Sequence, residues 1–346
     1  MSILSFPRLA SWLTVSALTL STLTACNPPK SGDQIADAAN GEACAPEIAE
    51  LEFAILTTES HENLKSNWEP LLAQMSTAVG RPVIGFYATD YAGIVEAMGA
   101  GKVQVAWYGG KSYIEAAERS DAEAFGQVLS LDGTKGYHSY LITNKDNAIV
   151  DGIDPEAGNG DKYVVEHAAD LTLAFNDPNS TSGFLVPSYY VFAQQGVNAE
   201  TIFDEILYAG SHEATALAVA EDQVDVATNN SFILGRLQET NPEALEKIQI
   251  IWTSPIIPND PLAYRKDLPD CLKESIQTFF FNYDNEAILL SLQWTGFAPA
   301  RDEDWDIVRE LQVAKDILDV QNSIGLSEED KQAELDELNK KLEALK

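Results

Sequence analysis

Short apolar runs alternate with amphipathic stretches along most of the chain. Residues 52–56, which are apolar from Phe53 onward, predict a buried strand, and residues 82–87 predict a second one. Between them, Trp68, Leu71, Leu72 and Met75 recur at helical spacing, which predicts a helix. Because this alternation continues to about residue 252, the pattern predicts an α/β fold with largely parallel, mixed sheets.

One part of this pattern occurs twice. The stretches YAGIVEAMGAGKVQVAWYGG, from Tyr91, and HEATALAVAEDQVDVATNN, from His212, each predict a small-residue helix, a polar turn and a Val-x-Val-Ala strand. The first valine of that strand, Val103 or Val224, lies twelve positions after the start in both. Two ordinary αβ units would also look alike. We favour two lobes of similar plan that present helix N-termini and strand ends to a shared crevice, where α/β sheets bind ligands.

Two regions depart from the alternation. Residues 145–164 are rich in Gly and Asp with little periodicity, which predicts a surface loop in the second lobe. Beyond Trp294 the pattern becomes helical. The apolar face of the first C-terminal helix consists of Ile307, Val308, Leu311 and Ala314.

A second C-terminal helix follows the capping-box residues Ser327 and Asp330. Its apolar stripe consists of Leu335, Leu338, Leu342 and Leu345. Because the stripe spans little more than one heptad, we expect it to pack on the body of the protein. Dimerisation through the C-terminal helices is the alternative.

The N-terminal segment has the pattern of a lipoprotein signal peptide. Arg8 precedes an apolar core at residues 9–20, and Leu-Thr-Ala-Cys ends at Cys26. In such a segment the Cys26 thiol receives a diacylglycerol, so we expect an extracytoplasmic or periplasmic protein that is anchored to a membrane by lipid. Residues 27–48, rich in Pro, Gly, Ala, Asp and Asn, predict a tether.

Cys44 and Cys271 are the only other cysteines. Export to an oxidising compartment favours a disulfide that would fix the end of the tether to the body. Two separate thiols remain the alternative, because pairing cannot be read from a sequence.

The composition restricts the class of partner. The chain has 54 acidic and 22 basic residues, a formal charge of −32, and it contains no basic patch with which to bind nucleic acid. At physiological salt, charges are screened over about 8 Å, so the acidic surface has little effect at a closed site and acts mainly on the rate of encounter.

A run of hydroxyl residues marks the best candidate for binding chemistry. Ser180, Thr181, Ser182 and Gly183 follow an apolar strand and open a helix-length run. The free amides of a helix start carry partial positive charge, hydroxyls add donors, and glycine lets the backbone approach closely, so the turn suits an oxyanion. Plain capping is the alternative, but a cap needs only one such residue. No Gly-Lys-Ser/Thr follows, which excludes a Walker loop.

This segment also carries a family resemblance. NDPNSTSGFLVPSYYVF resembles the corresponding stretch of the periplasmic phosphonate-binding components of ABC importers, within the phosphate, phosphite and phosphonate solute-binding family. The resemblance extends to TTESHENLKSNWEPLL, FYATDYAGIVEAM, VAWYGGKS, GYHSYL, SHEATALAVAEDQVDVATNN and SPIIPNDPL, from about Phe53 to Trp294. It implies a two-lobed (type II) periplasmic binding protein that closes over its ligand and works with an ABC permease and ATPase.

The resemblance also implies a ligand shell. Phosphonate oxygens would be held by the Ser180–Ser182 turn. The other residues at matching positions are Tyr91, Tyr137, His212 and Asp260. A phenol and an imidazole donate hydrogen bonds without negative charge. Asp260 either accepts from a protonated ligand oxygen or orients a Tyr or His. Without the resemblance, His212 and Tyr137 would be interpreted as structural residues.

One position departs from the family pattern. Members that take aminoalkylphosphonates have a Glu shortly after Thr-Asn-Asn, where it meets the ligand's ammonium; here Phe232 stands there. A phenyl ring cannot make that charge-assisted bond. We therefore expect a small ligand, phosphite or methylphosphonate, favoured over 2-aminoethylphosphonate. Ethylphosphonate and inorganic phosphate are alternatives, and a phosphate hydroxyl against apolar groups would cost about 1–3 kcal/mol.

Other functions are less consistent with the residues. Ser182, His212 and Asp260 form a formal hydrolase triad, but Gly-x-Ser-x-Gly is absent and the serine lies in a hydroxyl run, so we expect no enzymatic activity. The four histidines show no metal-ligand spacing, and we expect no metal or cofactor. A lipid-tethered oxyanion sensor remains an alternative to an importer component.

The expected lobes follow from the chain pattern. Lobe 1 would comprise residues 49–139 and 255–312, and lobe 2 residues 140–254. A C-terminal helical tail would span residues 313–346. The two crossings, near Tyr140 and Ser254, would form the hinge.

Overall fold

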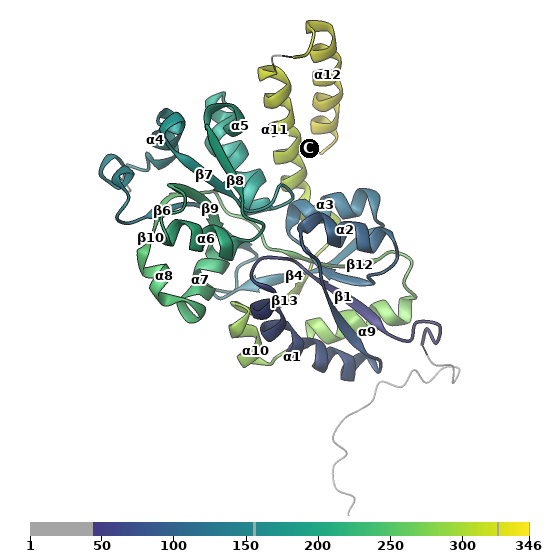
Figure 1. Cartoon of the computed structure of the whole chain (residues 1–346). Helices are drawn as coiled ribbons and strands as arrows, with labels where there is room; N and C mark the ends of the chain where they lie inside the picture. Colours follow the sequence, from purple (N-terminus) through teal and green to yellow (C-terminus); the bar gives the residue numbers. More distant parts are fainter. Residues whose placement is uncertain (1–43, 155–156, 324, 346) are drawn as a thin grey trace, which may run out of the picture. The chain divides into compact units, whose positions relative to one another are not determined.

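Two mixed sheets organise the chain. The structure, a computed structural model, describes residues 44–154, 157–323 and 325–345 (Figure 1). The expected signal peptide, Cys26 and residues 27–43 of the tether lie outside the described residues. Among the described helices, none is both long and apolar enough to span a bilayer.

The first sheet has six strands in the order β13-β4-β12-β3-β1-β2. Its strands are β1 (Leu51–Ile55), β2 (Val83–Tyr87), β3 (Val105–Trp107), β4 (Ala122–Ser130), β12 (Pro261–Arg265) and β13 (Trp294–Pro299). β1 pairs parallel with β2 and β3, whereas the pairings that involve β4, β12 and β13 are antiparallel. We call this sheet and its helices lobe 1. Those helices are α1 (His61–Val79), α2 (Tyr91–Gly99), α3 (Gly110–Arg119), α9 (Asp270–Phe281) and α10 (Glu286–Ser291).

Helices cover both faces of this sheet: α1 contacts α9 on one face and α2 contacts α3 on the other (Figure 1). The centre of the core is aromatic. The Trp68 ring of α1 lies 5.5 Å from Phe53 of β1, 5.2 Å from Trp107 of β3 and 5.5 Å from Trp294 of β13. Large tilted ring pairs of this kind stabilise a core beyond the area that they bury.

The second sheet has five strands in the order β10-β6-β9-β7-β8. Its strands are β6 (Ser139–Asn144), β7 (Thr172–Phe175), β8 (Glu205–Tyr208), β9 (Val226–Asn230) and β10 (Ile248–Thr253). β7 pairs parallel with β8 and β9, and β6 pairs antiparallel with β9 and β10.

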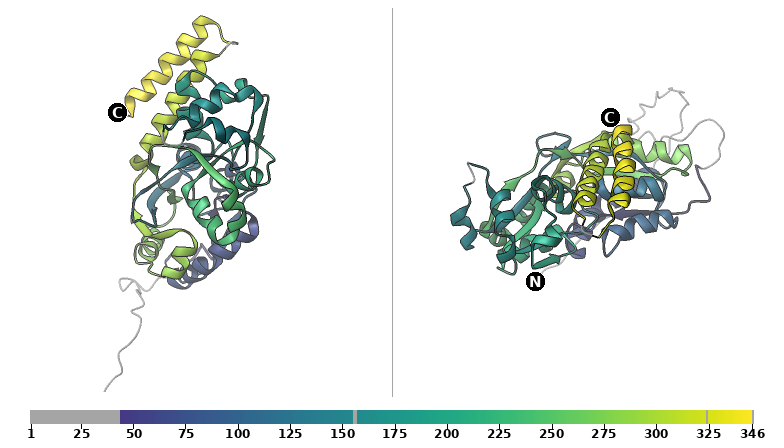
Figure 2. Two further views of the ribbon diagram at one scale, coloured as in Figure 1. Left: turned by 90° about the vertical axis from the view of Figure 1, so that its left-hand side faces the viewer. Right: turned by 90° about the horizontal axis from the view of Figure 1, so that it is seen from above.

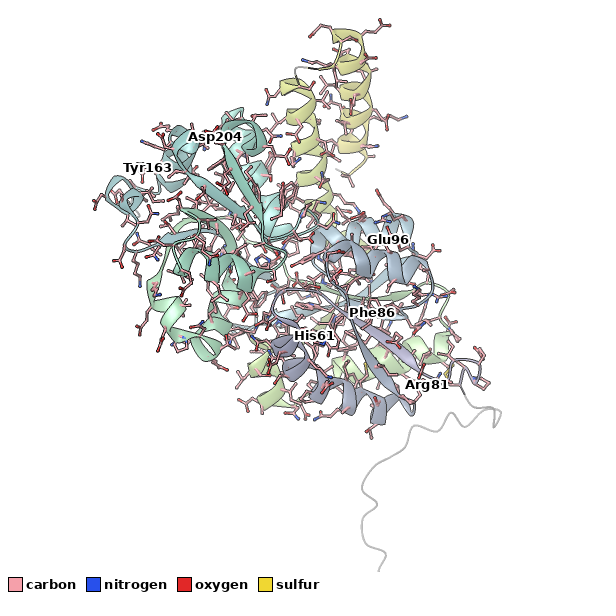
Figure 3. The ribbon with its side chains drawn as sticks, viewed as in Figure 1. His61, Arg81, Phe86, Glu96, Tyr163 and Asp204 are labelled. Atoms are coloured by element: carbon pink, nitrogen blue, oxygen red, sulfur yellow. A yellow bond between two sulfur atoms is a disulfide. The ribbon has the colours of Figure 1, made fainter. Side chains whose placement is uncertain are left out.

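We call this sheet and its helices lobe 2. The helices are α4 (Gly160–Glu166), α5 (Ala199–Ile202), α6 (His212–Ala220), α7 (Ser231–Thr240) and α8 (Pro242–Lys247). Consecutive residues of its strands, such as Leu173 and Ala174, enter apolar clusters on opposite faces. Because both faces are buried, these strands are apolar at successive positions. Figure 3 labels Tyr163 and Asp204 in lobe 2, and Phe86 and Glu96 in lobe 1.

The expected α/β fold is confirmed, but parallel pairing is less extensive than the alternation predicted. The strands that follow each crossing between the lobes, β6 and β12, run antiparallel to their neighbours because the chain re-enters each sheet from the opposite end. The predicted surface loop over residues 145–164 is wrong in part. It contains a 3₁₀ turn (Ala148–Gly152) and the start of α4, with Ile149, Ile153 and Val164 buried.

The internal repeat is present as two αβ units. α2 precedes β3 in lobe 1, and α6 precedes β9 in lobe 2. Asp90 and Ser211 cap the two helices, and each accepts a hydrogen bond from a backbone amide three residues later. Tyr91 and His212 are therefore the first residues of equivalent helices, one in each lobe.

Two chain segments connect the sheets and run side by side. The Ser139 amide donates to the Ser254 hydroxyl and the Ser254 amide donates to the Ser139 carbonyl, each at 2.9 Å. A two-stranded sheet of β5 (Gly136–Tyr137) and β11 (Ile257–Pro258) lies next to them. Because the sheets separate here, we propose the lobe boundaries and the hinge near Tyr140 and Ser254 given above.

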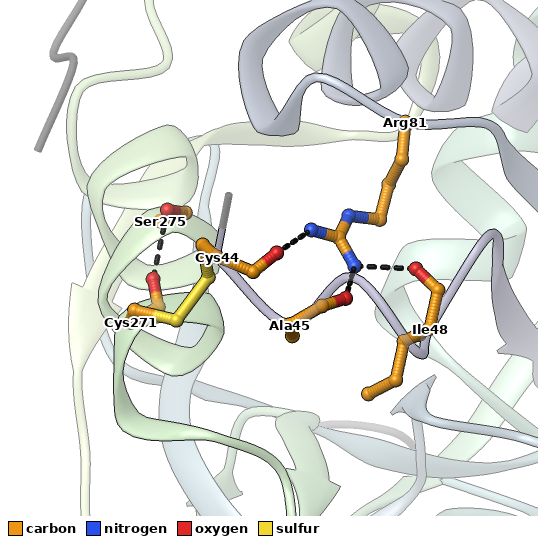
Figure 4. Close-up of a disulfide and its surroundings, with 6 residues drawn as sticks. All are labelled: Cys44, Ala45, Ile48, Arg81, Cys271 and Ser275. Carbon is orange, nitrogen blue, oxygen red and sulfur yellow. Dashed lines mark hydrogen bonds between the residues drawn. A yellow bond between two sulfur atoms is a disulfide. The ribbon is translucent and has the colours of Figure 1, made fainter. Parts of the chain in front are cut away.

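A disulfide joins Cys44 to Cys271, at the start of α9, with 6.0 Å between the Cα atoms (Figure 4). The Arg81 guanidinium donates to the carbonyls of Cys44, Ala45 and Ile48, which fixes the same short segment. The end of the expected tether is thereby held against lobe 1.

The C-terminal tail is a helical hairpin of α11 (Asp306–Asn322) and α12 (Glu328–Ala344), which lie side by side (Figures 1 and 2). α11 contacts α3 of lobe 1 and the turns around Thr181–Leu185 and Ser188–Phe192 of lobe 2. Val308 and Leu311 are buried as expected, but Ile307 is exposed. The leucines of α12 are only partly buried, because α12 packs on α11 and not on a sheet.

Candidate ligand-binding site

The Ser-Thr-Ser turn follows β7 and faces lobe 1. The Ser180 hydroxyl accepts from the Gly183 amide at 2.9 Å, and a π-helical turn occupies Thr181–Leu185. Ser180, Thr181 and Ser182 are all buried. A Cβ atom on Gly183 would lie 2.5 Å from Asn176 Cβ and 2.9 Å from His212 Cε1, so only glycine lets the turn approach the imidazole this closely.

His212 lies against this turn. Its Nε2 atom is 3.3 Å from the Ser180 hydroxyl and 3.4 Å from the Ser182 hydroxyl. Burial, and then the positive charge of Arg236, lower the pKa of His212 to about 3. The imidazole is therefore neutral, with one N–H to donate, and the partial positive charge at the start of α6 lies beside it.

Tyr91 approaches Ser180 from lobe 1. Its hydroxyl accepts from the Asn176 side-chain amide at 2.9 Å and lies near the Ser180 hydroxyl. Burial raises the pKa of Tyr91 above its ordinary value, so the phenol keeps its proton. Tyr91 and His212, the two equivalent helix starts, thus meet at Ser180.

Tyr137, at the end of β5, completes the group of hydroxyls. Its hydroxyl lies near the side chains of Ser182, Thr181 and Asp260. Burial, and then the negative charge of Asp260, raise the pKa of Tyr137 well above its ordinary value. The ring of Phe232 lies 5.2 Å from the ring of Tyr137. Phe232 is therefore an apolar neighbour of these side-chain hydroxyls.

Asp260 follows β11 and is buried beside Tyr137. Burial raises the pKa of Asp260 to about 7, although the charge of Arg236 and the nearby Tyr137 hydroxyl lower it. At neutral pH this carboxyl is therefore close to half protonated, and it can donate or accept.

Thr181 also makes an inter-lobe contact. Its hydroxyl accepts from the Lys111 amide at the start of α3, at 2.8 Å. The Lys111 ammonium donates to the Asn179 side chain at 3.1 Å. Because a hydroxyl that accepts one bond can still donate its proton, this contact leaves Thr181 one bond for a ligand.

The sequence expectations missed several buried polar residues of the site. Arg236 of α7 forms an ion pair with Glu59 of lobe 1, and Asn230 donates to the Ser182 hydroxyl at 3.2 Å. The available signal for Arg236 was its position four residues after Phe232, on the same face of a helix. No local signal pointed to Glu59, which precedes α1.

This arrangement suits a tetrahedral oxyanion. Hydroxyls, an imidazole and helix starts converge from both lobes, and none of these donors carries a formal negative charge. His212 Nδ1, Asn176 Oδ1 and Asp260 Oδ1 are buried and have no hydrogen-bond partner within the described part of the chain. Buried polar atoms are normally paired, so a ligand is a natural partner for His212 Nδ1, whereas the two oxygens could pair only with a protonated ligand oxygen.

Two cavities lie outside this cluster. One, of about 380 Å³, is lined by Met98, Gly99, Gly101, Ser120, Asp121, Arg265, Lys266 and Asp267. Arg265 is neutralised there by Asp267, so the cavity offers little net charge to an anion. The other, of about 100 Å³, lies beside α11 and includes Phe184 and Lys315. Across the described residues, no group of three His, Cys, Asp or Glu is placed to hold a metal.

Comparisons with known proteins identify the family of the chain. The family described as "ABC transporter, phosphonate, periplasmic substrate-binding protein" matches residues 53–305. The chain is 42% identical over 299 residues to the phosphonates-binding periplasmic protein of Escherichia coli, with 85% of each chain covered. It is 25% identical to a phosphate-import protein of Mycolicibacterium smegmatis, over 75% of this chain and 84% of that one.

A solved structure agrees as well. The binding protein component of an ABC phosphonate transporter from Pseudomonas aeruginosa has a TM-score of 0.80 and 42% identity, covering 86% of this chain and 96% of that one. The expected family and two-lobed fold are thereby confirmed. The chain belongs to the periplasmic substrate-binding proteins of phosphonate ABC transporters.

Proposed function

We propose that this protein captures a small phosphonate or phosphite between its lobes, performs no chemistry on it, and delivers it to an ABC permease and ATPase. The observation that carries the proposal is the position of His212 Nε2, 3.3 Å and 3.4 Å from two hydroxyls of one turn. Ser180, Thr181, Ser182, the Gly183 amide, Tyr91, Tyr137 and His212 would bind the oxygens. Because these side chains are buried, the lobes must separate for the ligand to enter.

We propose that Phe232 selects a ligand with a small apolar substituent. Its ring lies against Tyr137, so it fills the space beside the hydroxyls with carbon and offers nothing to an ammonium group. Methylphosphonate or phosphite would then be preferred to 2-aminoethylphosphonate. Asp260, with a pKa near 7, would accept a proton shared with a ligand oxygen or donate its own.

Inorganic phosphate is the second candidate ligand. The phosphate-import relative at 25% identity supports testing it. Phosphate has a hydroxyl where methylphosphonate has a methyl group, and leaving that hydroxyl unpaired against Phe232 would cost about 1–3 kcal/mol. We therefore expect phosphate to bind, but more weakly.

The geometry does not favour hydrolysis. In a Ser-His-Asp triad the carboxylate orients the imidazole through Nδ1. Here His212 Nδ1 and Asp260 Oδ1 both lack a hydrogen-bond partner in the described residues, so the carboxyl does not orient the imidazole. The proposed serine nucleophile would lack an oriented base.

We also propose that the protein is held at a membrane by a lipid. A lipid on Cys26 would anchor the protein in its periplasmic location, with residues 27–48 as the tether. A receptor that reports oxyanion concentration to a membrane sensor would use the same closed state. Adjacent genes for an ATPase and a permease would favour the importer component.

A thermal-shift panel tests the proposal. We would measure the melting temperature with phosphite, methylphosphonate, ethylphosphonate, 2-aminoethylphosphonate, phosphate and sulfate. We expect the largest increases with methylphosphonate or phosphite, since a ligand that binds only the folded protein stabilises it. No shift with any phosphorus oxyanion would overturn the proposal, and the largest shift with phosphate would establish the second candidate.

A further inference from the structure

Glu59 and Arg236 bury a pair of opposite charges between the lobes. Glu59 lies between β1 and α1 in lobe 1, and Arg236 lies in α7 of lobe 2. The two side chains are 3% and 4% exposed, with 2.7 Å between a guanidinium nitrogen and a carboxylate oxygen. The same nitrogen of Arg236 donates to the Thr58 hydroxyl at 3.2 Å. The proposed ligand shell uses neither charged residue.

A second set of contacts joins the same two surfaces. The Glu213 amide donates to the Thr58 carbonyl at 3.1 Å, and the Glu213 carboxylate accepts from the Ser60 amide and from the Asn63 side chain. Glu213 is adjacent to His212, so the loop before α1 is fixed to lobe 2 beside the proposed site. His61, labelled in Figure 3, marks the end of this loop.

Arg236 also acts electrostatically on the proposed site. Its charge lowers the pKa of both His212 and Asp260. Among the described residues, Arg236 is the only buried lysine or arginine. In a chain of charge −32 with an anionic ligand, this cation offsets the carboxylates around the site. Arg236 belongs to lobe 2, but the carboxylate that holds it in place is Glu59 of lobe 1.

A buried ion pair is costly to desolvate, and the cost is greatest when one partner is lost. When the lobes are apart, the facing surfaces of the lobes are hydrated, and each charge is solvated separately. The pair is therefore an interaction of the closed state. Burial, and to a smaller extent the like charge of Glu213, raise the pKa of Glu59 above its ordinary value, and the charge of Arg236 opposes this rise.

We propose that Arg236 is a positioning residue of the ligand site, which pairs with Glu59 when the lobes close and so couples closure to the binding of an anion. The inference rests on the proposed function, because it takes the ligand to be an oxyanion bound beside His212. It assigns the two residues a role in the closing step and no direct contact with the ligand.

A double-mutant cycle on the full-length protein tests this inference. The variants are Arg236→Met, Glu59→Gln and the double substitution, with methylphosphonate titrated by calorimetry. Arg236→Met leaves a buried carboxylate unpaired near an anion, so we expect affinity to fall by about a hundredfold or more. Glu59→Gln, which keeps a hydrogen-bond acceptor, should reduce it by about tenfold.

The double variant gives the decisive result. Glu59→Gln removes the unpaired carboxylate left by Arg236→Met, so we expect it to restore at least about tenfold of the lost affinity. Arg236→Lys should retain more affinity than Arg236→Met. The matched control is Arg119→Met, which removes an exposed arginine paired with Glu96 and Glu115 within lobe 1 and should leave affinity unchanged.

The melting temperature without ligand separates a closure contact from a permanent structural pair. If the pair forms on closure, the two substitutions should show no coupling in the unliganded protein. Equal coupling with and without ligand, or additive losses of affinity, would overturn the inference and leave the proposed function standing. A wild-type protein that binds none of methylphosphonate, phosphite and phosphate would overturn both.

Discussion

The Ser182 hydroxyl, in the turn after β7, lies 3.4 Å from Nε2 of His212, the first residue of α6. Asn230 donates to the same hydroxyl at 3.2 Å, which leaves the hydroxyl proton free to point at a ligand or at the imidazole. Two helix starts and one strand end of lobe 2 therefore act on a single oxygen atom.

Substitution of Ser182 with alanine removes that donor without removing a helix cap. A hydrogen bond to a charged group contributes about 1.5–3 kcal/mol, so we expect methylphosphonate affinity to fall by roughly 10- to 100-fold in calorimetry. Ser275→Ala, which removes a hydroxyl bonded to the Cys271 carbonyl in α9, is the control and should bind normally. Unchanged affinity of Ser182→Ala would place the ligand elsewhere.

Tyr91→Phe tests the contribution of lobe 1. The Tyr91 hydroxyl contacts Asn176 and Ser180 of lobe 2, so the substitution removes a donor and an inter-lobe contact together. We expect affinity to fall by at least about tenfold, with dissociation becoming faster. Tyr208→Phe, which removes a hydroxyl bonded to Glu200 at the surface, should have no effect. Equal behaviour of the two variants would contradict the assignment.

Phe232→Glu tests ligand selection. A carboxylate beside Tyr137 would pair with an ammonium group, so the ratio of affinities for 2-aminoethylphosphonate and methylphosphonate should rise by about tenfold. The gain is limited because Arg236 lies four residues later on the same helix and competes for the new charge. Phe232→Gln is the control, because glutamine has nearly the size of glutamate without its charge. A similar gain in the affinity ratio for Phe232→Gln would show that space, and not charge, decides the preference.

The pH dependence of affinity tests Asp260. Its pKa rises to about 7 on burial, so it takes up a proton as the lobes close, and closure is most favourable at low pH. Compared with Asp260→Asn, the wild-type affinity should fall from about pH 4 to about pH 7, by at most about tenfold per pH unit, and then level off. The comparison cancels the ligand's own titration. Parallel profiles of the two proteins would show that Asp260 does not titrate.

Salt should change the association rate of the ligand and leave its dissociation rate nearly constant. The net charge of −32 repels an anion, and salt screens that repulsion beyond about 8 Å at physiological strength. We expect stopped-flow association of methylphosphonate to become faster as salt rises, at a nearly constant dissociation rate. A dissociation rate that rises steeply with salt would instead indicate that exposed charges hold the ligand.

The sequence was informative where function depends on neighbouring residues. The Ser180–Ser182 turn and the equivalent positions of Tyr91 and His212 were predicted because each lies at a helix start with its own local pattern. The Arg236 and Thr58 contact could not be found in this way, since the residues are 178 positions apart and meet only because two lobes pack together. The Thr181 bond to the Lys111 amide was missed for the same reason.

The most direct test of the central claim is a crystal structure of the protein grown with methylphosphonate. We expect a phosphorus atom enclosed by Tyr91, Tyr137, Ser182 and His212, with its methyl group toward Phe232. Methylphosphonate bound elsewhere, such as in the cavity beside Arg265, with these four residues free of ligand, would contradict it.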